Sequence, residues 1–500
     1  MRKLLALLLA LALVMSLAVT ASAEAARDTL VVIPFTKCEN LDPYNDTIDM
    51  DSIVMCNVFD NLWQRDENCE YQGMLAKEWT LSDDGRYYIV TLRDDVTFSD
   101  GTPVNADAVI YSYQCALKMS SWGYTYSTVI KDIEKVDEYT VNIYKYASYS
   151  SIIPFCTDYL PIVSPTAREG HEAEFAKKPV GSGSYTVESF DPATNYVVMK
   201  AREDYFQGAP AIEYVEVRVP LDSAVALVAL ENDEVQLISM PMNETDLDLA
   251  EDEGFSVYAS AGWACKTLLI WCEPFNSDNE LALAVNQAVN RENVAIYMGN
   301  DATPAKNYYS EKLMGRYAGK VPVYDYDPEA AAAHLAASGY DGSVIKITVP
   351  PDQEMAGLSV YNDLMAIGIN CELNVVETST YYDMWNDATV GITIADYGVA
   401  YSSPEEMLSY FATDGFYNMY GLCASNEAYD SNLKAAGEAW ADDERETYTL
   451  AAIEAARDLS QYVPLYDIQS KYVASPALKG MDDSYAATYR FYLWKAYFGD

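Results

Sequence analysis

The sequence predicts a mixed α/β protein made of two or three lobes, and three observations lead to this expectation. Segments with a strand pattern alternate with segments with a helix pattern, without any short internal repeat. The chain has 500 residues, more than one compact core usually accommodates. Hydrophobic residues make up 50% and charged residues 22% of the chain, which suits a folded globular protein and argues against disorder or a coiled coil.

The first 23 residues have the three parts of a cleavable export signal. Two basic residues open the chain, the apolar run 4–19 follows, and Ala21-Ser-Ala23 offers a cleavage site. The alternative is an N-terminal membrane anchor, but a run of 16 residues is short for a bilayer span. The first cysteine is Cys38, so the usual lipoprotein acceptor is missing. We therefore expect export to the periplasm or another extracytoplasmic space of the cell envelope.

The beginning of the mature chain has strand patterns. The β-branched run Thr29–Ile33 predicts a buried strand, and 79–93 predicts a hairpin because Ser82-Asp-Asp-Gly85 supplies its turn. Three alternating residues then share one face of the second hairpin strand: Tyr88, Val90 and Leu92. Further strands are expected over 139–144, 185–189, 196–200, 212–219, 463–468 and 489–496.

Helix starts are marked by capping residues. Asn105 can cap a helix over 106–118, because its side-chain oxygen can accept a backbone N–H that the first turn leaves without a partner. Asp327-Pro-Glu329 opens a helix with a capping acid, a proline and an acid facing the positive end of the helix dipole. Gly339 is expected just after its end, and Ser403-Pro-Glu-Glu406 predicts a similar start. Further helices are expected over 224–231, 280–298 and 448–459.

The charge balance excludes one class of partner. The chain carries 32 basic and 76 acidic side chains, a formal net charge of −44. A surface of this sign repels polyphosphate, so we expect no DNA or RNA partner.

The cysteines and histidines do not predict a metal site. Nine cysteines are an odd number, so at least one thiol stays unpaired in a monomer, and the pairing of the others is open. There is no C-x-x-C pair, and His171 and His334 stand in unrelated contexts, so we expect neither a zinc site nor another cofactor. Most thiols are expected to be buried small hydrophobic groups. The cysteines are Cys38, Cys56, Cys69, Cys115, Cys156, Cys265, Cys272, Cys371 and Cys423.

Motifs for catalysis are weak. Gly181-Ser-Gly-Ser-Tyr185 lacks the final glycine of a nucleophile elbow and the lysine of a phosphate-binding loop. With 76 acids, paired carboxylates occur by chance. Glycosidase activity therefore stays an alternative, but no particular pair of carboxylates supports it. The 42 tyrosines favour a binding protein only weakly, because most of them are expected to pack half-buried at the surface.

A series of short motifs, taken together, resembles one family. The motifs are Leu41-Asp-Pro43, Gly73–Gly85, Leu92–Val109, Pro179–Tyr185, Arg202–Pro210, Ala229–Val235, Asn286–Asn293, Tyr326–Glu329 with Gly339-Tyr340, Ile367–Asn370 and Val463–Tyr466. In this order, over essentially the whole mature chain, they resemble the family 5 extracellular solute-binding proteins of ABC importers, the oligopeptide-, dipeptide- and nickel-binding type.

The resemblance implies a two-lobed periplasmic-binding-protein fold (type II, cluster C-like) with an extra domain inserted in the first lobe. The first lobe would take 24–60, 180–265 and 471–500, the inserted domain 61–179 and the second lobe 266–470. The lobes would close around a ligand, and the closed form would deliver it to the transmembrane subunits of an ABC permease. Such a receptor is expected to be a monomer and not an enzyme.

One motif departs from the family. Peptide binders carry a Trp-x-Ala-Asp-Tyr-x-x-Pro type motif whose aspartate pairs with the α-ammonium of the ligand. The matching segment, Tyr397-Gly-Val-Ala-Tyr-Ser-Ser-Pro404, has tyrosine for the tryptophan and Ala400 for the aspartate. Losing one partner of such a buried pair costs about 2–5 kcal/mol, so recognition of a free amine should be weakened. Three acids could substitute, although Asp396 could equally be a solvated acid at a strand end: Asp396, Asp49 and Asp51.

The resemblance also implies which residues contact the ligand in the cleft between the lobes. The expected positions are Thr47, Ile48, Asp49, Tyr111, Asp396, Tyr397, Ala400, Tyr401 and Tyr466. The ligand is expected to be an oligopeptide, held by its backbone with broad specificity. The alternatives are an oligosaccharide or an N-blocked peptide, then nickel, and an exported hydrolase as a different class.

Overall fold

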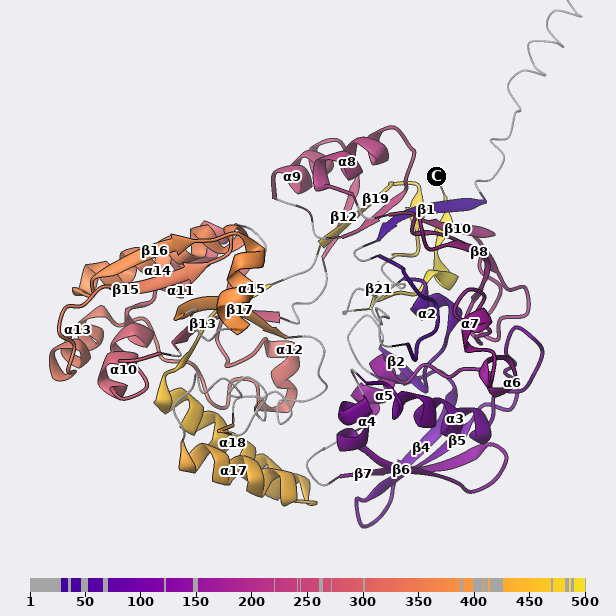
Figure 1. The fold of residues 1–500 in the computed structure, drawn as a ribbon, viewed down its shortest axis with the longest axis horizontal. Coiled ribbons are helices and arrows are strands. Elements are labelled where there is room, and N and C mark those ends of the chain that lie inside the picture. Colours follow the sequence, from indigo (N-terminus) through magenta and orange to yellow (C-terminus); the bar gives the residue numbers. More distant parts are fainter. Residues whose placement is uncertain are drawn as a thin grey trace, which may run out of the picture.

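The structure is a computed structural model and has two lobes side by side (Figure 1). It describes residues 28–34, 37–45, 53–65, 71–120, 123–146, 152–219, 221–240, 242, 244–259, 264–270, 272–299, 302–386, 389, 391–398, 408, 412–413, 426–468, 471–481, 485–486 and 490–499. The expected signal peptide and the expected helix start at 403–406 lie outside the described residues.

The first lobe is built on a seven-stranded sheet with the order β12-β19-β11-β1-β10-β9-β8. Its strands are β1 (Thr29–Pro34), β8 (Tyr185–Asp191), β9 (Tyr196–Ala201), β10 (Tyr214–Val217), β11 (Leu237–Ser239), β12 (Ser256–Ala259) and β19 (Lys471–Ala474). β1 is parallel to β10 and β11, and the other pairs are antiparallel. Helices α8 (Ser223–Glu231) and α9 (Glu244–Asp252) pack on one face and share an apolar cluster with β1 and β11.

A four-stranded antiparallel sheet, β4-β5-β7-β6, lies at the other end of this lobe. Its strands are β4 (Ala76–Leu81), β5 (Tyr87–Leu92), β6 (Ile130–Lys135) and β7 (Thr140–Lys145). Tyr88, Val90 and Leu92 are buried, which confirms the predicted hairpin and its inner face. One continuous apolar core joins this sheet to the seven-stranded sheet. The remaining elements here are α2 (Met55–Val58), β2 (Trp63–Arg65), β3 (Tyr71–Gly73), α3 (Ala106–Ala116), α4 (Gly123–Val129), α5 (Ile153–Tyr159), α6 (Pro165–Arg168) and α7 (Glu172–Phe175).

The second lobe is built on a six-stranded mixed sheet, β14-β18-β13-β17-β15-β16. Its strands are β13 (Ala264–Ile270), β14 (Ala302–Pro304), β15 (Ile345–Val349), β16 (Cys371–Val375), β17 (Ile392–Gly398) and β18 (Tyr462–Ile468). Leu268 and Leu269 point to opposite faces, since side chains alternate along a strand, and each belongs to a different apolar cluster. The cluster of Leu268 includes α10 (Asn279–Ala288), α11 (Arg291–Met298), α13 (Pro328–Ala337) and α14 (Glu354–Ile367). The cluster of Leu269 includes α17 (Glu427–Glu438) and α18 (Asp442–Leu459), and smaller elements are α12 (Glu311–Met314), η1 (Gly315–Tyr317), η2 (Pro351–Gln353) and α15 (Thr378–Asn386).

Two predicted caps are confirmed. The Asn105 side chain accepts a hydrogen bond from the N–H of Ala108 at the start of α3. The Asp327 side chain accepts from the N–H groups of Glu329 and Ala330 at the start of α13. In each case one side-chain oxygen provides the acceptor that the first helical turn lacks.

Two predicted elements are wrong in their continuity. The helix expected over 280–298 is two helices, α10 and α11, because Val289 is extended and Asn290 caps the second helix. The strand expected over 489–496 is broken: β22 (Arg490–Phe491) is followed by η4 (Leu493–Lys495) and β23 (Tyr497–Phe498). The cause is a side chain. Asn57 donates to the Phe491 carbonyl at 2.6 Å and accepts from the Leu493 N–H at 2.8 Å, so these groups bind α2 instead of a strand.

The chain passes between the two large sheets twice, and the strand residues that flank the two passages are paired with each other. β12 leads into β13, and β18 leads into β19. Ala259 is paired with Lys471 in the first sheet, and Ala264 is paired with Ile468 in the second sheet. Among the described residues, no helix combines the length and the apolar character needed to span a membrane.

Candidate functional site

The structure describes four of the nine predicted ligand-contact residues. Tyr111 lies on α3 in the first lobe, and Tyr466 lies on β18 in the second lobe. Asp396 and Tyr397 are placed by their backbone on β17. The other five lie outside the described residues: Thr47, Ile48, Asp49, Ala400 and Tyr401. The structure therefore places three predicted residues on β17 and β18, the two strands that flank β13 in the second lobe, and leaves Tyr111 in the first lobe.

The three second-lobe residues stand at the end of the sheet next to the chain passages. Lys266 of β13 is opposite Asp396 on one side and Tyr466 on the other. One step closer to the passages, Cys265 is opposite Tyr397 and Asp467. Residues at these strand ends are thus carried on the part of the second lobe that leads directly into the first.

Tyr466 is a core residue in this structure. Its ring is buried in the apolar cluster of α10, α11 and α14. Its hydroxyl donates to Oε1 of Gln353, the residue before α14, at 2.9 Å. Tyr466 therefore ties the start of α14 to β18.

Asp467 is a residue that the motif comparison missed. Its Oδ1 atom is buried and has no hydrogen-bond partner. Burial raises the pKa of this carboxyl group to about 6. Alternation along the strand could have found it, because the neighbour of an inward-facing Tyr466 must point to the other face of the sheet. An incompletely bonded carboxylate can accept from an ammonium or a hydroxyl group.

A buried ion pair organises the first-lobe motif Leu41-Asp-Pro43. Asp42 accepts from Nε of Arg168 at 2.9 and 3.0 Å, and Nη2 of Arg168 lies 2.9 Å from Oδ2. Asp42 also accepts from the N–H of Tyr44 at 3.0 Å. The pair fixes the segment just before Thr47–Asp49, so the motif residue acts as an anchor.

Tyr111 belongs to the surroundings of the same arginine. Arg168 donates to the sulfur of Cys115 at 3.1 Å and interacts electrostatically with Tyr111. Burial raises the pKa of Tyr111 to about 12, so its hydroxyl stays protonated at neutral pH. Tyr111 is half-buried and packs against the apolar core of the first lobe beside the anchor of Asp42.

A second buried polar cluster of the first lobe surrounds Asp60. Asp60 is buried, accepts from the Tyr205 hydroxyl at 3.1 Å through Oδ1, and has no partner on Oδ2. Burial raises the pKa of Asp60 to about 6. A Cβ on Gly181 would overlap the Val58 carbonyl, so glycine is required for the close approach of this loop. The Gly-Ser-Gly motif is thus structural at this position.

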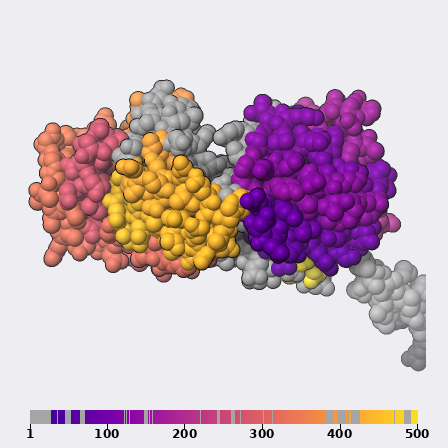
Figure 2. Space-filling view, turned by 90° about the horizontal axis from the view of Figure 1, so that it is seen from below, coloured from indigo at the N-terminus to yellow at the C-terminus, as the bar shows by residue number. Residues whose placement is uncertain are grey.

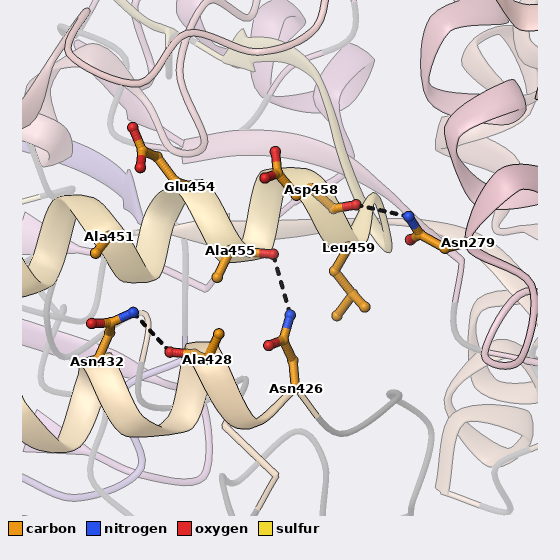
Figure 3. A pocket seen from close by; sticks show the side chains of 9 residues that line it. All are labelled: Asn279, Asn426, Ala428, Asn432, Ala451, Glu454, Ala455, Asp458 and Leu459. Carbon is orange, nitrogen blue, oxygen red and sulfur yellow. Dashed lines mark hydrogen bonds between the residues drawn. The ribbon is translucent and has the colours of Figure 1, made fainter.

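An open depression of about 470 Å³ lies between α17 and α18 (Figure 3). Its lining residues are Asn279, Asn426, Ala428, Asn432, Ala451, Glu454, Ala455, Asp458 and Leu459. The three asparagine amides donate to main-chain carbonyls, those of Asp458, Ala455 and Ala428. Two of these amides, those of Asn279 and Asn426, bond to α18, and that of Asn432 bonds within α17; the depression contains none of the predicted ligand residues.

The surroundings of the described cysteines and of His334 are those of packed or hydrogen-bonded residues. Five of the seven described cysteines are buried, which agrees with the prediction, while Cys69 and Cys423 lie outside the described residues. His334 on α13 has Nδ1 at 2.6 Å from Glu280 on α10. Within the part of the chain that the structure describes, no group of three or more His, Cys, Asp or Glu could hold a metal ion.

The sequence and fold are similar to those of known binding proteins. The family described as bacterial extracellular solute-binding proteins, family 5 Middle, matches residues 70–418. The fold is similar to the ABC transporter substrate-binding protein CtaP from Listeria monocytogenes, with a TM-score of 0.84, 20% identity, and coverage of 95% of this chain and 100% of that chain. It is also similar to DppA from Helicobacter pylori in complex with the peptide STSA, with a TM-score of 0.74, 23% identity, and coverage of 95% and 99%.

A curated relative is similar over part of its length. The glutathione-binding protein GsiB of Shigella flexneri serotype 5b (strain 8401) is 28% identical over 324 residues. The match covers 63% of this chain and 62% of that protein, less than two thirds of either. The likeness to the solved structures shows the fold, which is that of two-lobed binding proteins.

Proposed function

The chain belongs to the family 5 bacterial extracellular solute-binding proteins, and from this premise we propose that it is the substrate-binding component of an ABC importer. It captures an oligopeptide between its lobes and delivers it to the transmembrane subunits of a permease. The observation that carries this proposal is that the chain joins two separately packed sheets twice at one place, since Ala259 is paired with Lys471 in the first sheet and Ala264 with Ile468 in the second. Two chain connections at one place between the lobes permit rotation of one lobe against the other.

Closure follows from differential binding. A ligand that contacts both lobes has more contacts in the closed arrangement than in the open one, so it shifts the equilibrium toward closure. The first lobe contributes the segment after the Asp42 anchor, and the second contributes the strand ends around Tyr397. We propose the nine predicted residues as the contact set and add Asp467, whose free carboxylate oxygen is at the same strand ends. The lobe boundaries are those inferred from the sequence.

The ligand class rests on relatives and on one substitution. One structural neighbour holds a peptide, and the curated relative is named for binding glutathione, a small peptide. This supports an oligopeptide. Ala400 at the amine-pairing position supports the second candidate, an N-blocked or modified peptide, and the tyrosines of the predicted contact set would offer stacking faces to an oligosaccharide. We further propose that the protein acts outside the cytoplasm, as a monomer and without catalysing a reaction.

Native mass spectrometry of the protein purified from its own cells tests the proposal. We expect a co-purifying ligand of peptide mass, which fragmentation identifies. Synthetic copies of that ligand should bind in calorimetry, and incubation with the protein should leave them intact. Hydrolysis of the ligand would contradict the receptor function, and a co-purified sugar would replace the peptide with the oligosaccharide.

A further inference from the structure

One side chain of the second lobe packs directly on the first lobe. Trp440 lies in the connection between α17 and α18. Nζ of Lys145, the last residue of β7, is 4.9 Å from the centroid of its ring, and the guanidinium carbon of Arg86 is 5.6 Å from it. Both distances are within the range at which the face of an aromatic ring attracts a cation. Seen from below, the α17–α18 region meets the N-terminal part of the first lobe (Figure 2).

The hairpin turn of the first lobe lies under the same ring. A Cβ on Gly85 would lie 3.8 Å from the Trp440 carbonyl oxygen and 3.9 Å from its Cε3 ring atom, which is ordinary van der Waals contact. Gly85 has φ +71°, a conformation that glycine adopts without strain. The turn predicted from Ser82–Gly85 therefore also packs against Trp440.

Arg445 holds the connection that carries Trp440. Its buried guanidinium donates to the carboxylate of Asp442 at 2.6 Å and to the carbonyl of Ala439 at 2.8 Å. It also reaches the carbonyl of Trp440 itself at 3.4 Å. The ring is thus presented by a connection whose conformation is already fixed, which lowers the entropy that the contact must overcome.

Water is excluded from the lysine side of the contact. The Lys145 residue is only 2% exposed. Burial lowers the pKa of its ammonium to about 8, and Arg445 of the other lobe contributes in the same direction. A cation–π contact is strongest where the cation has lost its water. This favours the Lys145 contact over an exposed pair of the same geometry.

The contact lies on the far side of the lobes from the chain passages. Figure 1 shows α17 and β7 at the bottom of the two lobes, whereas β12 and β19 lie near the top. We propose that Trp440, Lys145 and Arg86 form an interlobe clasp that stabilises the closed arrangement independently of the ligand. Trp440 is then a positioning residue: it raises ligand affinity by increasing the closed population, without touching the ligand.

The overall negative charge of the chain explains why an additional attraction between the lobes would be needed. The chain has a net charge of −44, so approach of the lobes is opposed by repulsion between acidic surfaces. The clasp puts two of the 32 basic side chains against an aromatic face, where the attraction is short-ranged. It therefore offsets part of the repulsion at this contact between the lobes.

Small-angle X-ray scattering of the dialysed, ligand-free chain tests the clasp. Trp440→Ala and Arg86→Gln should each lower the ratio of closed to open molecules, by about tenfold for Trp440→Ala, and should raise the radius of gyration. The double variant should open hardly more than Trp440→Ala alone, because both changes remove the same contact. Tyr297→Ala is the matched control, since Tyr297 is an aromatic residue of the same lobe with 46% exposure against 38% for Trp440.

The outcomes separate the clasp from simple packing. Arg86→Gln changes an exposed side chain on the other lobe and should fold, so it decides the question if Trp440→Ala does not fold. Unchanged scattering for both Trp440→Ala and Arg86→Gln would overturn the proposal. Opening with Trp440→Ala but not with Arg86→Gln or Lys145→Met would overturn the role of the cations. None of these outcomes depends on the identity of the ligand, so the test stands apart from that of the proposed function.

Discussion

Two buried arginines, one in each lobe, fix motif segments in different ways. Arg168 of the first lobe is paired with the carboxylate of Asp42. Arg291 of the second lobe is also buried but donates to neutral oxygens, those of Pro464 at 2.6 Å, Tyr324 at 2.9 Å and Asn286 at 2.9 Å. The pKa of Arg168 is raised, with Asp42 favouring its charged form, whereas burial lowers the pKa of Arg291 to about 10.

The difference shows how the motifs of this family act in the chain. Asp42 belongs to the motif after β1, Arg291 and Asn286 belong to the motif that spans α10 and α11, and Pro464 belongs to the motif on β18. The Asp42 pair holds the segment before Thr47–Asp49, and Arg291 holds the strand that carries Tyr466. The first lobe uses a charge pair for this purpose, and the second uses hydrogen bonds alone. The two anchors should therefore respond differently to mutation.

Removal of Asp42 should have the largest effect. Asp42→Ala leaves the buried charge of Arg168 without its partner, which costs about 3–5 kcal/mol in the free energy of unfolding. Urea denaturation measures it. Asp95→Ala is the control, because Asp95 lies at the same 2.9 Å from Arg93 but its side chain is 58% exposed. That variant should lose less than about 1 kcal/mol. Equal losses in the two variants would show that burial of the Asp42 pair does not matter.

Asp60 is a second buried acid of the first lobe, and unlike Asp42 it has no ion pair with an arginine or lysine among the residues that the structure describes. Asp60 has a pKa of about 6 in the folded chain, because burial disfavours its charged form. Unfolding lowers it to the ordinary value near 4, so the folded state holds more protons between about pH 4 and 6. Stability should therefore fall as pH rises through this interval and be constant above it. The loss is about 3 kcal/mol, from a shift of about two pKa units at about 1.4 kcal/mol each.

Asp60→Asn should remove this part of the pH dependence. The difference in the free energy of unfolding between the variant and the original chain should therefore shift in favour of the variant as pH rises from 4 to 7. Thermal unfolding across pH 4–8 measures the difference between the variant and the original chain. Asp363 and Asp467 also have pKa values raised to about 6, so both curves keep some slope. Parallel curves would mean that Asp60 titrates normally.

Local signals predicted much of the fold because they act over a few residues. The Ser82–Gly85 turn and the Asn105 cap need only near neighbours in the chain, and both are present. The broken strand after Arg490 could not be predicted, because its cause, the Asn57 side chain, is 434 residues away from Phe491 in sequence. The position of Tyr466 in the core could not be predicted either, because its hydrogen bond to Gln353 joins residues far apart in the sequence. Its contact with a ligand stays a prediction. The clasp at Trp440 likewise depends on a contact between lobes that no local pattern indicates.

Replacement of Arg291 should cost less than that of Asp42. Arg291→Met removes a buried charge and leaves neutral acceptors unbonded, among them the Pro464 carbonyl, so we expect a loss of about 2 kcal/mol. Equilibrium denaturation again measures it, with Arg218→Met as an exposed control at 3.8 Å from Glu216. A loss larger than that of Asp42→Ala would reverse the comparison, since it would make the neutral anchor the stronger one.

The smallest expected effect concerns the ligand rather than stability. Ala400→Asp restores the acid that pairs with a ligand α-ammonium in peptide binders. It should raise the preference for trialanine over N-acetyl-trialanine by about tenfold, or 1.4 kcal/mol, measured by calorimetry. An unchanged preference would remove Ala400 from the explanation. Asp396→Asn and Asp467→Asn then identify a substitute: whichever of them lowers a preference already present in the original chain is the acid that binds the amine, and it would be a second-lobe residue in either case.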